Sequence, residues 1–148
     1  MDTSRTVSAD AADDKLEYPD IPTDIIRMLM DIGYVAAGCG LKSHAESIFD
    51  ALIAARPSSE LPLIGLAVVK ITFGRISEAS KILTETVTKI NPDSQLAKAF
   101  FGLLLKQIGS NHESEIVLNE VIKNNSDEDA VTLAKSILSD SDNKKLIN

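Results

Sequence analysis

The chain has 148 residues, of which 44% are hydrophobic and only 4% aromatic, so we expect one domain with an aliphatic core. The formal net charge is −7, but residues 1–24 hold seven acids and two bases, which leaves 15 acids and 13 bases in a nearly neutral remainder. No basic stripe favours nucleic acid, and the longest apolar stretch, residues 61–69, is too short to cross a membrane. We therefore expect neither a nucleic-acid partner nor membrane insertion.

The first hairpin follows a polar leader. Residues 1–22 are rich in Ser, Thr, Ala and Asp without a helical apolar stripe, which predicts a disordered acidic leader. Pro22, with Thr23 or Asp24 as the N-cap, predicts that the domain begins at residue 23 and that a helix covers about 24–38. A second helix is expected over 42–56, where Ser43 and Glu46 have the spacing of a capping box.

Two similar hairpins and a final helix complete the predicted domain, residues 23–140. The hairpins pair 61–73 with 77–90 and 94–107 with 111–123, which gives three units over about 26–59, 60–93 and 95–126. Asp127 predicts the cap of a last helix over 127–139, whose apolar stripe would cover the open edge of the third unit. Residues 141–148 are predicted to be a flexible tail.

The three units share a turn glycine and the residues that follow it. Gly40, Gly74 and Gly109 stand 34 and 35 residues apart, so one residue is inserted before the third. Each is followed by a small residue and, four positions later, a large one: Ala45 and Phe49, Ala79 and Leu83, Ser114 and Leu118. This pattern is typical of tetratricopeptide (TPR) repeats. The sequence therefore predicts an all-α, TPR-like helical-hairpin solenoid of three repeats plus a C-terminal capping helix, and a binding protein rather than an enzyme.

No catalytic residue, metal site or cofactor is predicted. Cys39 is the only cysteine, and pairing it with His44 would lack a third, orienting group, so we expect a small buried side chain at a turn. The run 140–143 resembles the start of a calcium loop but lacks its glycine and its final glutamate.

The inner face of the predicted solenoid is mostly apolar. Modules that bind a peptide carboxylate need Lys, Arg and Asn there, whereas aliphatic side chains suit the apolar face of an amphipathic helix. The predicted partner-binding residues are Met30, Tyr34, Ala37, Leu61, Ile64, Val68, Ile71, Leu96, Ala99 and Leu103. The alternatives are that the last helix, residues 16–19 or a second copy in a homodimer covers this face.

Four stretches carry a family resemblance: 29–40, 44–49, 56–57 and 63–67. Together they resemble the small TPR-like proteins of bacterial type III secretion systems, namely Hrp-type secretion proteins and needle-subunit co-chaperones, over about residues 24–138. The resemblance implies a cytoplasmic chaperone that holds an amphipathic helix of a needle or rod subunit, often together with a small co-chaperone, and prevents premature polymerisation. The alternatives are an accessory structural component in the periplasm or cell wall, an exported protein, and a self-associating TPR adaptor.

Overall fold

The described part of the chain is entirely helical. A computed structural model describes the backbone of residues 20–147 and the side chains of residues 20–142, so most of the predicted leader lies outside the described residues. The helices are α1 (Thr23–Gly38), α2 (Lys42–Ala55), α3 (Glu60–Thr72), α4 (Ile76–Lys81), the π-helix η2 (Ile82–Thr86), α5 (Val87–Ile90), α6 (Gln95–Gln107), α7 (Asn111–Asn124) and α8 (Glu128–Ile147). Because α4, η2 and α5 follow one another without a break, they form one helix.

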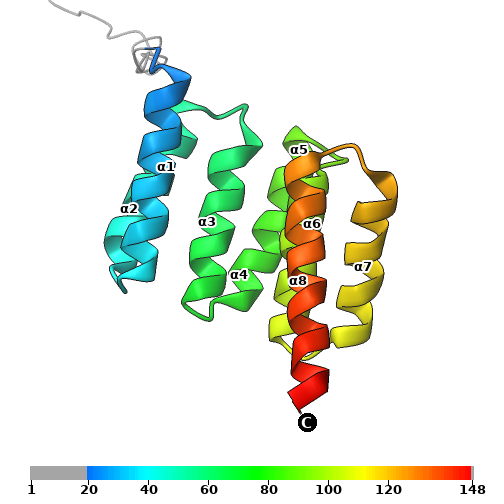
Figure 1. The fold of residues 1–148 in the computed structure, drawn as a ribbon. Helices are drawn as coiled ribbons and strands as arrows, with labels where there is room; N and C mark the ends of the chain where they lie inside the picture. The colour runs from blue at the N-terminus through cyan, green and yellow to red at the C-terminus, as the bar shows by residue number, and fades with distance from the viewer. Residues whose placement is uncertain (1–19, 148) are drawn as a thin grey trace, which may run out of the picture.

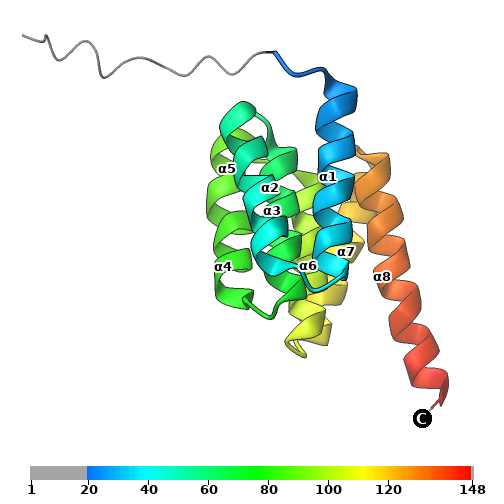
Figure 2. The same ribbon diagram turned by 90° about the vertical axis from the view of Figure 1, so that its left-hand side faces the viewer.

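The helices stack as three hairpins and a final helix (Figure 1). The hairpins are α1 with α2, α3 with α4–η2–α5, and α6 with α7, while α8 packs against both α6 and α7. Viewed along the stack, α1 and α8 stand on one side and α2 and α4 on the other (Figure 2). This arrangement confirms the predicted all-α, TPR-like fold.

A glycine in the left-handed conformation ends the first helix of each hairpin. The φ angles are 77° at Gly40, 73° at Gly74 and 84° at Gly109, a region that residues with a Cβ rarely adopt. The same geometry at the same place in each unit confirms the predicted repeat register.

Phe49 of α2 packs between two glycines of neighbouring helices. The Phe49 side chain is 0% exposed. A Cβ added at Gly33 of α1 would lie 2.7 Å from its ring, and one added at Gly65 of α3 would lie 2.2 Å from it. Leu118 of α7 approaches Gly102 of α6 in the same way, at 2.6 Å. Missing side chains on the first helices therefore let large side chains of the second helices reach the interfaces.

The second helix of the second unit contains the residue that lengthens the repeat. It spans residues 76–90, or 15 residues, whereas α2 and α7 have 14 each. A π-helical turn accommodates one extra residue without rotating the rest of the helix. The main buried positions agree, since they follow the order 45, 49, 52 in α2 and 114, 118, 121 in α7 but 79, 83, 87 here. The insertion is thus absorbed between Leu83 and Val87.

Several helix ends differ from the prediction. The capping box at Ser43 is wrong, because α2 begins at Lys42 and its N-cap is Leu41 without a side-chain bond. The N-cap of α1 is likewise Pro22 rather than Thr23 or Asp24. The predicted cap of α8 is confirmed, as Asp127 Oδ1 accepts a hydrogen bond from the Ala130 amide at 3.1 Å.

The last helix is longer than predicted. It extends to Ile147, past the predicted end at residue 139, and so includes most of the predicted tail. Neither Gly nor Pro occurs after Asp127, so no residue interrupts the helix.

Candidate partner-binding face

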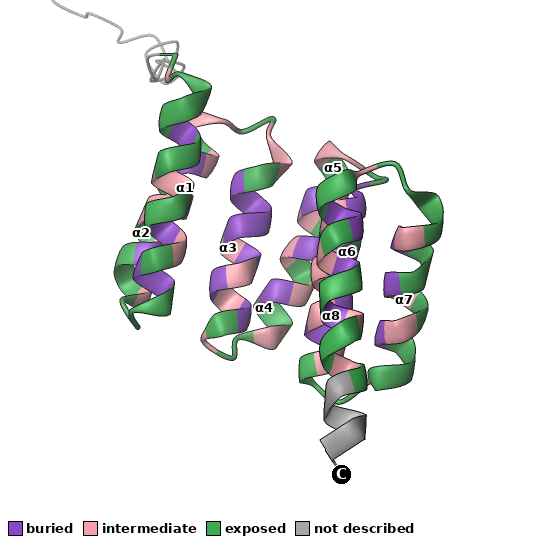
Figure 3. Ribbon diagram, viewed as in Figure 1, coloured by how far each residue is buried: buried purple, intermediate pink, exposed green. Residues whose placement is uncertain are grey.

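Four of the predicted partner-binding residues belong to the core. Ile64 and Ile71 of α3 are 1% and 4% exposed, and Ala37 and Ala99 are 6% and 0% exposed. Ile64, Ile71 and Ala99 contact neighbouring helices rather than solvent because α3 and α6 pack against helices on both sides (Figure 3). Ala37 of α1 belongs to the cluster that includes Phe49 of α2 and Val69 of α3. These four side chains form part of the core under the face and are not part of its exposed surface.

The third unit's share of the predicted face is covered by α8. Leu96 and Leu103 of α6 are partly buried against a cluster that includes Ala130, Ala134 and Ile137 of α8. The Lys106 Nζ of α6 also donates a hydrogen bond to the Ile137 carbonyl oxygen at 2.7 Å. Part of the inner face is therefore occupied by the chain's own last helix, as one of the alternatives expected.

Four predicted residues on α1 and α3 keep exposed surface. Leu61 is 44% exposed, and Met30, Tyr34 and Val68 are partly exposed. We call these four residues the α1–α3 face. The Tyr34 ring lies 5.1 Å from that of Phe49 between centroids, with the planes tilted by 54°. Burial, with a contribution from Asp31, raises the pKa of Tyr34 above its ordinary 10.0. The hydroxyl of Tyr34 provides a polar group on an apolar surface.

Lys70 makes an ion-pair network that the sequence pattern did not predict. Its Nζ lies 2.7 Å from Glu46 Oε1 of α2 and 3.3 Å from Glu78 Oε2 of α4, which also binds Arg75. The hydrogen bond to Glu46 is the main reason that the pKa of Lys70 is raised and that of Glu46 lowered. The network therefore joins the first two units, and it leaves Lys70 of α3 paired with carboxylates of the same chain.

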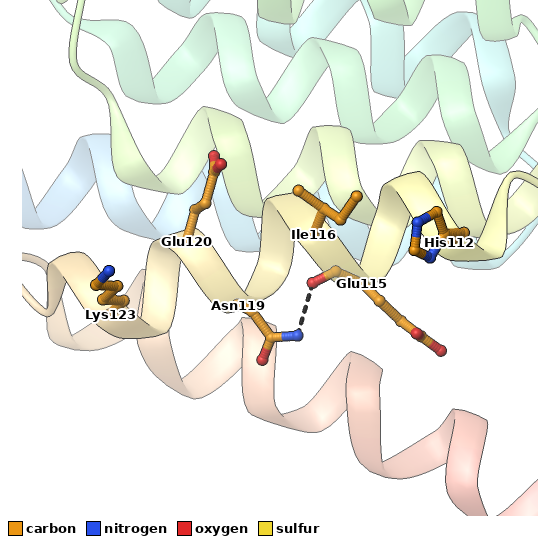
Figure 4. Close-up of a pocket in the computed structure, with 6 residues that line it drawn as sticks. All are labelled: His112, Glu115, Ile116, Asn119, Glu120 and Lys123. Carbon is orange, nitrogen blue, oxygen red and sulfur yellow. Dashed lines mark hydrogen bonds between the residues drawn. The ribbon is translucent and has the colours of Figure 1, made fainter.

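The surface depressions lie elsewhere. The one in Figure 4 is lined by six residues of a single helix, α7: His112, Glu115, Ile116, Asn119, Glu120 and Lys123. Asn119 Nδ2 donates to the Glu115 carbonyl oxygen at 2.8 Å, a bond within that helix. Two others, which share Thr84 and Phe101, run between α4–η2–α5 and α6. None of these three depressions includes a predicted partner-binding residue.

Cys39 is exposed, so the prediction of a buried cysteine is wrong. It is the C-cap of α1. Among the described residues, no three His, Cys, Asp or Glu side chains are grouped as metal ligands would be. No helix in the same part of the chain has the length and hydropathy to span a membrane.

The stacked hairpins and the apolar inner face define a helical-repeat protein of the TPR-like class. The HrpB1_HrpK family of bacterial type III secretion proteins matches residues 16–143. The chain belongs to this family, which confirms the resemblance seen in the sequence. No curated protein matches the chain.

Solved structures of similar fold include secretion chaperones and TPR domains. The type III secretion translocator chaperone SycD of Yersinia enterocolitica has a TM-score of 0.59 at 20% identity, over 84% of this chain and 96% of that one. SycD in complex with a peptide of the translocator YopD gives 0.58 at 17%, over 84% and 97%. The Sgt2 TPR domain of Aspergillus fumigatus gives 0.59 at 20%, over 85% and 82%. At these identities the similarity concerns the fold.

Proposed function

We propose that this protein is a type III secretion chaperone or adaptor whose inner face binds an amphipathic helix of a needle or rod subunit and prevents its premature polymerisation. One observation carries the proposal. The helix α8 packs its apolar stripe on the inner face of α6, while the neighbouring α1–α3 face remains partly exposed. The first two units therefore offer a helix-binding surface that the described chain leaves open.

The packing of α8 indicates which ligand would fit. Its inward residues include Ala130, Ala134 and Ile137, at helical spacings of four and three, against aliphatic side chains of α6. A ligand helix on the α1–α3 face would present apolar residues at i, i+3 or i+4, and i+7 in the same way. The hydroxyl of Tyr34 would hydrogen-bond a polar group at the edge of that helix.

The charges favour an apolar ligand over a peptide carboxylate. Binding a desolvated carboxylate requires cations that can be directed at it. Lys70 pairs with Glu46 and Glu78, and Lys106 bonds to α8. Both lysines are therefore engaged within the fold.

The relatives support a protein ligand. SycD has been solved with a peptide of the translocator YopD, and the first TPR domain of Spaghetti (RPAP3) with an HSP90 peptide. A chaperone of subunits awaiting export would work in the cytoplasm, together with a small co-chaperone. Cell fractionation tests this location, and recovery in the periplasm would favour the accessory structural role.

Co-expression with needle, rod and co-chaperone subunits of the same secretion system tests the proposal. We expect a stoichiometric complex with one of them. Leu61→Asp and Val68→Asp should each weaken it at least about tenfold, because a charge would be buried without a partner under the ligand helix. Ile64→Asp is unsuitable, since Ile64 is 1% exposed and the change would unfold the protein.

Ile108→Asp is the matched control. Ile108 is 52% exposed, close to the 44% of Leu61, but lines a depression between α4–η2–α5 and α6. Binding should survive this change, and circular dichroism should show equal helicity in all variants. Normal affinity in folded Leu61→Asp and Val68→Asp proteins would rule out the α1–α3 face as the binding site.

A further inference from the structure

The segment that precedes α1 is held to the end of α2. Arg56, the C-cap of α2, donates a hydrogen bond from Nη2 to the Ile21 carbonyl oxygen, and the same nitrogen lies 3.7 Å from Asp20 Oδ1. The Ile21 side chain is partly buried against the cluster that contains Phe49. The chain is therefore anchored to the first unit before its first helix begins, and the anchor fixes the point at which residues 1–19 join the domain.

This anchor lies at one end of the α1–α3 face. The helices α1 and α3 begin at the same end of the stack, at the top of Figure 1. Leu61, the most exposed of the four residues of the face, is the second residue of α3 and follows Arg56 by five residues. A turn between them is closed by the Ser59 amide, which donates to the Arg56 carbonyl oxygen at 3.0 Å. The residues before Asp20 therefore start near Leu61.

The sequence predicts that the residues just before the anchor are extended. Pro19 and Pro22 disfavour the helical conformation at the residues that precede them, Tyr18 and Ile21. Side chains alternate along an extended chain, so Leu16 and Tyr18 project to the same side. A short segment with two apolar side chains on one side is suited to an apolar surface.

The length of this segment matches the length of the face. Extended residues rise about 3.3 Å each, so the five steps from Ile21 back to Leu16 reach about 17 Å. The seven steps from Leu61 to Val68 along α3 rise only about 10 Å. The segment is therefore long enough to run back along the face from the anchor.

The family match includes this segment. It begins at residue 16, seven residues before the first residue of α1, and runs to residue 143. Residues 16–22 thus belong to the unit that the family shares, whereas residues 1–15 lie outside it. A shared segment that adjoins an open apolar face is expected to contact that face.

We propose that residues 16–19 of the same chain occupy the α1–α3 face until a ligand helix displaces them. The chain turns back at residues 20–22, so the segment runs antiparallel to α1. Leu16 and Tyr18 cover the apolar surface. The inference rests on the function proposed for this face and adds a competitor that the chain itself supplies.

The charges beside the face are complementary to the segment. Lys15 and Glu17 alternate with the two apolar residues and point outward, where Arg27 and Asp31 of α1 are exposed. In the antiparallel arrangement Glu17 comes nearer the start of α1, toward Arg27, and Lys15 comes toward Asp31. The spacings agree, because alternate residues of an extended chain are about 7 Å apart and four helical residues rise about 6 Å.

Paramagnetic broadening in the full-length protein tests this contact without any ligand. A nitroxide is attached at Asp14→Cys, just before the segment, in a Cys39→Ser background because Cys39 is exposed. We expect the methyl NMR signals of Leu61 and Met30 to be strongly broadened. The signals of Ile116 on α7, at the far end of the stack, should be unaffected (Figure 1).

The double substitution Leu16→Ser and Tyr18→Ser should detach the segment. It should reduce the broadening at Leu61 at least about threefold, because it lowers the docked fraction. Val7→Ser is the matched control, since Val7 is an apolar residue before the start of the family match, and it should leave the broadening unchanged. The proposal fails if the parent shows no broadening, if broadening survives the double substitution, or if it arises only between labelled and unlabelled copies.

The same double substitution should strengthen binding of the secretion subunit recovered by co-expression. While the segment covers the face, the apparent Kd is the intrinsic Kd divided by the open fraction, so detachment should lower it at least about threefold. An unchanged Kd would contradict the competition. Absence of any complex would count against the proposed function, whereas absence of broadening counts against the docked segment, so the two failures are distinguishable.

Discussion

Phe49 shows how single residues fix the angle between neighbouring units. Its ring fills the space that the missing side chains of Gly33 and Gly65 leave, and burying such a side chain contributes about 2–3 kcal/mol. The sequence predicted Phe49 from the repeat pattern, four residues after Ala45. It did not single out Gly65, because the pattern rests on the turn glycines and the residues that follow each of them, whereas Gly65 precedes Gly74.

Gly65→Ala is expected to destabilise the protein by about 1–3 kcal/mol, because the new methyl group would overlap the Phe49 ring. Gly38→Ala is the control: this exposed glycine ends α1 and has no atom within 4 Å of an added Cβ. It should leave stability unchanged or raise it by up to about 1 kcal/mol. Chemical denaturation measures both, and equal effects would contradict the close contact at Phe49.

The pair of Lys70 and Glu46 makes stability depend on pH. The folded protein lowers the pKa of Glu46 below its ordinary 4.5, so the pair's contribution is present above that pH and is lost as the pH falls through the folded value. The raised pKa of Lys70 means that the contribution also persists up to about its ordinary 10.5 and is lost above the folded value.

Glu46→Gln should therefore lower the unfolding free energy at neutral pH by about 0.5–1 kcal/mol, a typical value for a partly exposed pair. The difference from the parent should shrink as the pH falls below 4.5. Urea denaturation at several pH values measures it, with Glu85→Gln, an exposed position of η2, as the control. A difference that is independent of pH would mean that the ion pair does not stabilise the fold.

The π-helix η2 is the element that the sequence predicted least completely. The glycine intervals of 34 and 35 residues predicted a one-residue insertion between Gly74 and Gly109, but not its position. The structure places it between Leu83 and Val87, because those side chains keep their inward direction when one turn widens. A spacing counts residues along the chain and carries no information on which turn takes up the extra one.

Deletion of Thr84 should be tolerated, because it restores the spacing of four and three residues seen at the buried positions of α2 and α7. Deletion of Asn119, an equally exposed residue of α7, should cost at least about 2 kcal/mol, since it rotates Val121 out of the core. Thermal unfolding followed by circular dichroism compares the two. If both deletions lowered the stability equally, the π-helical turn would not be the place where the extra residue is inserted.

In the whole molecule, the fold was predicted more completely than the site. The repeat register follows from glycines and small residues, whose steric roles are local and leave a direct mark in the sequence. Which residues of the inner face meet solvent depends on contacts between units. Ile64 and Ile71 are buried by neighbours on both sides, and α8 covers Leu96 and Leu103. Four of the ten predicted positions, on α1 and α3, therefore form the open part of the face.

Because the second unit contains a one-residue insertion, the spacing between the second and third turn glycines can indicate the type of helix between them in other members of the family. In a relative whose second and third turn glycines stand 34 residues apart, the corresponding helix has no residue to accommodate and is expected to be regular throughout. A relative with an interval of 35 should contain the widened turn. The distance between two glycines would thus report the helix type of each member before its structure is known, and would divide the family into lineages with and without the added residue.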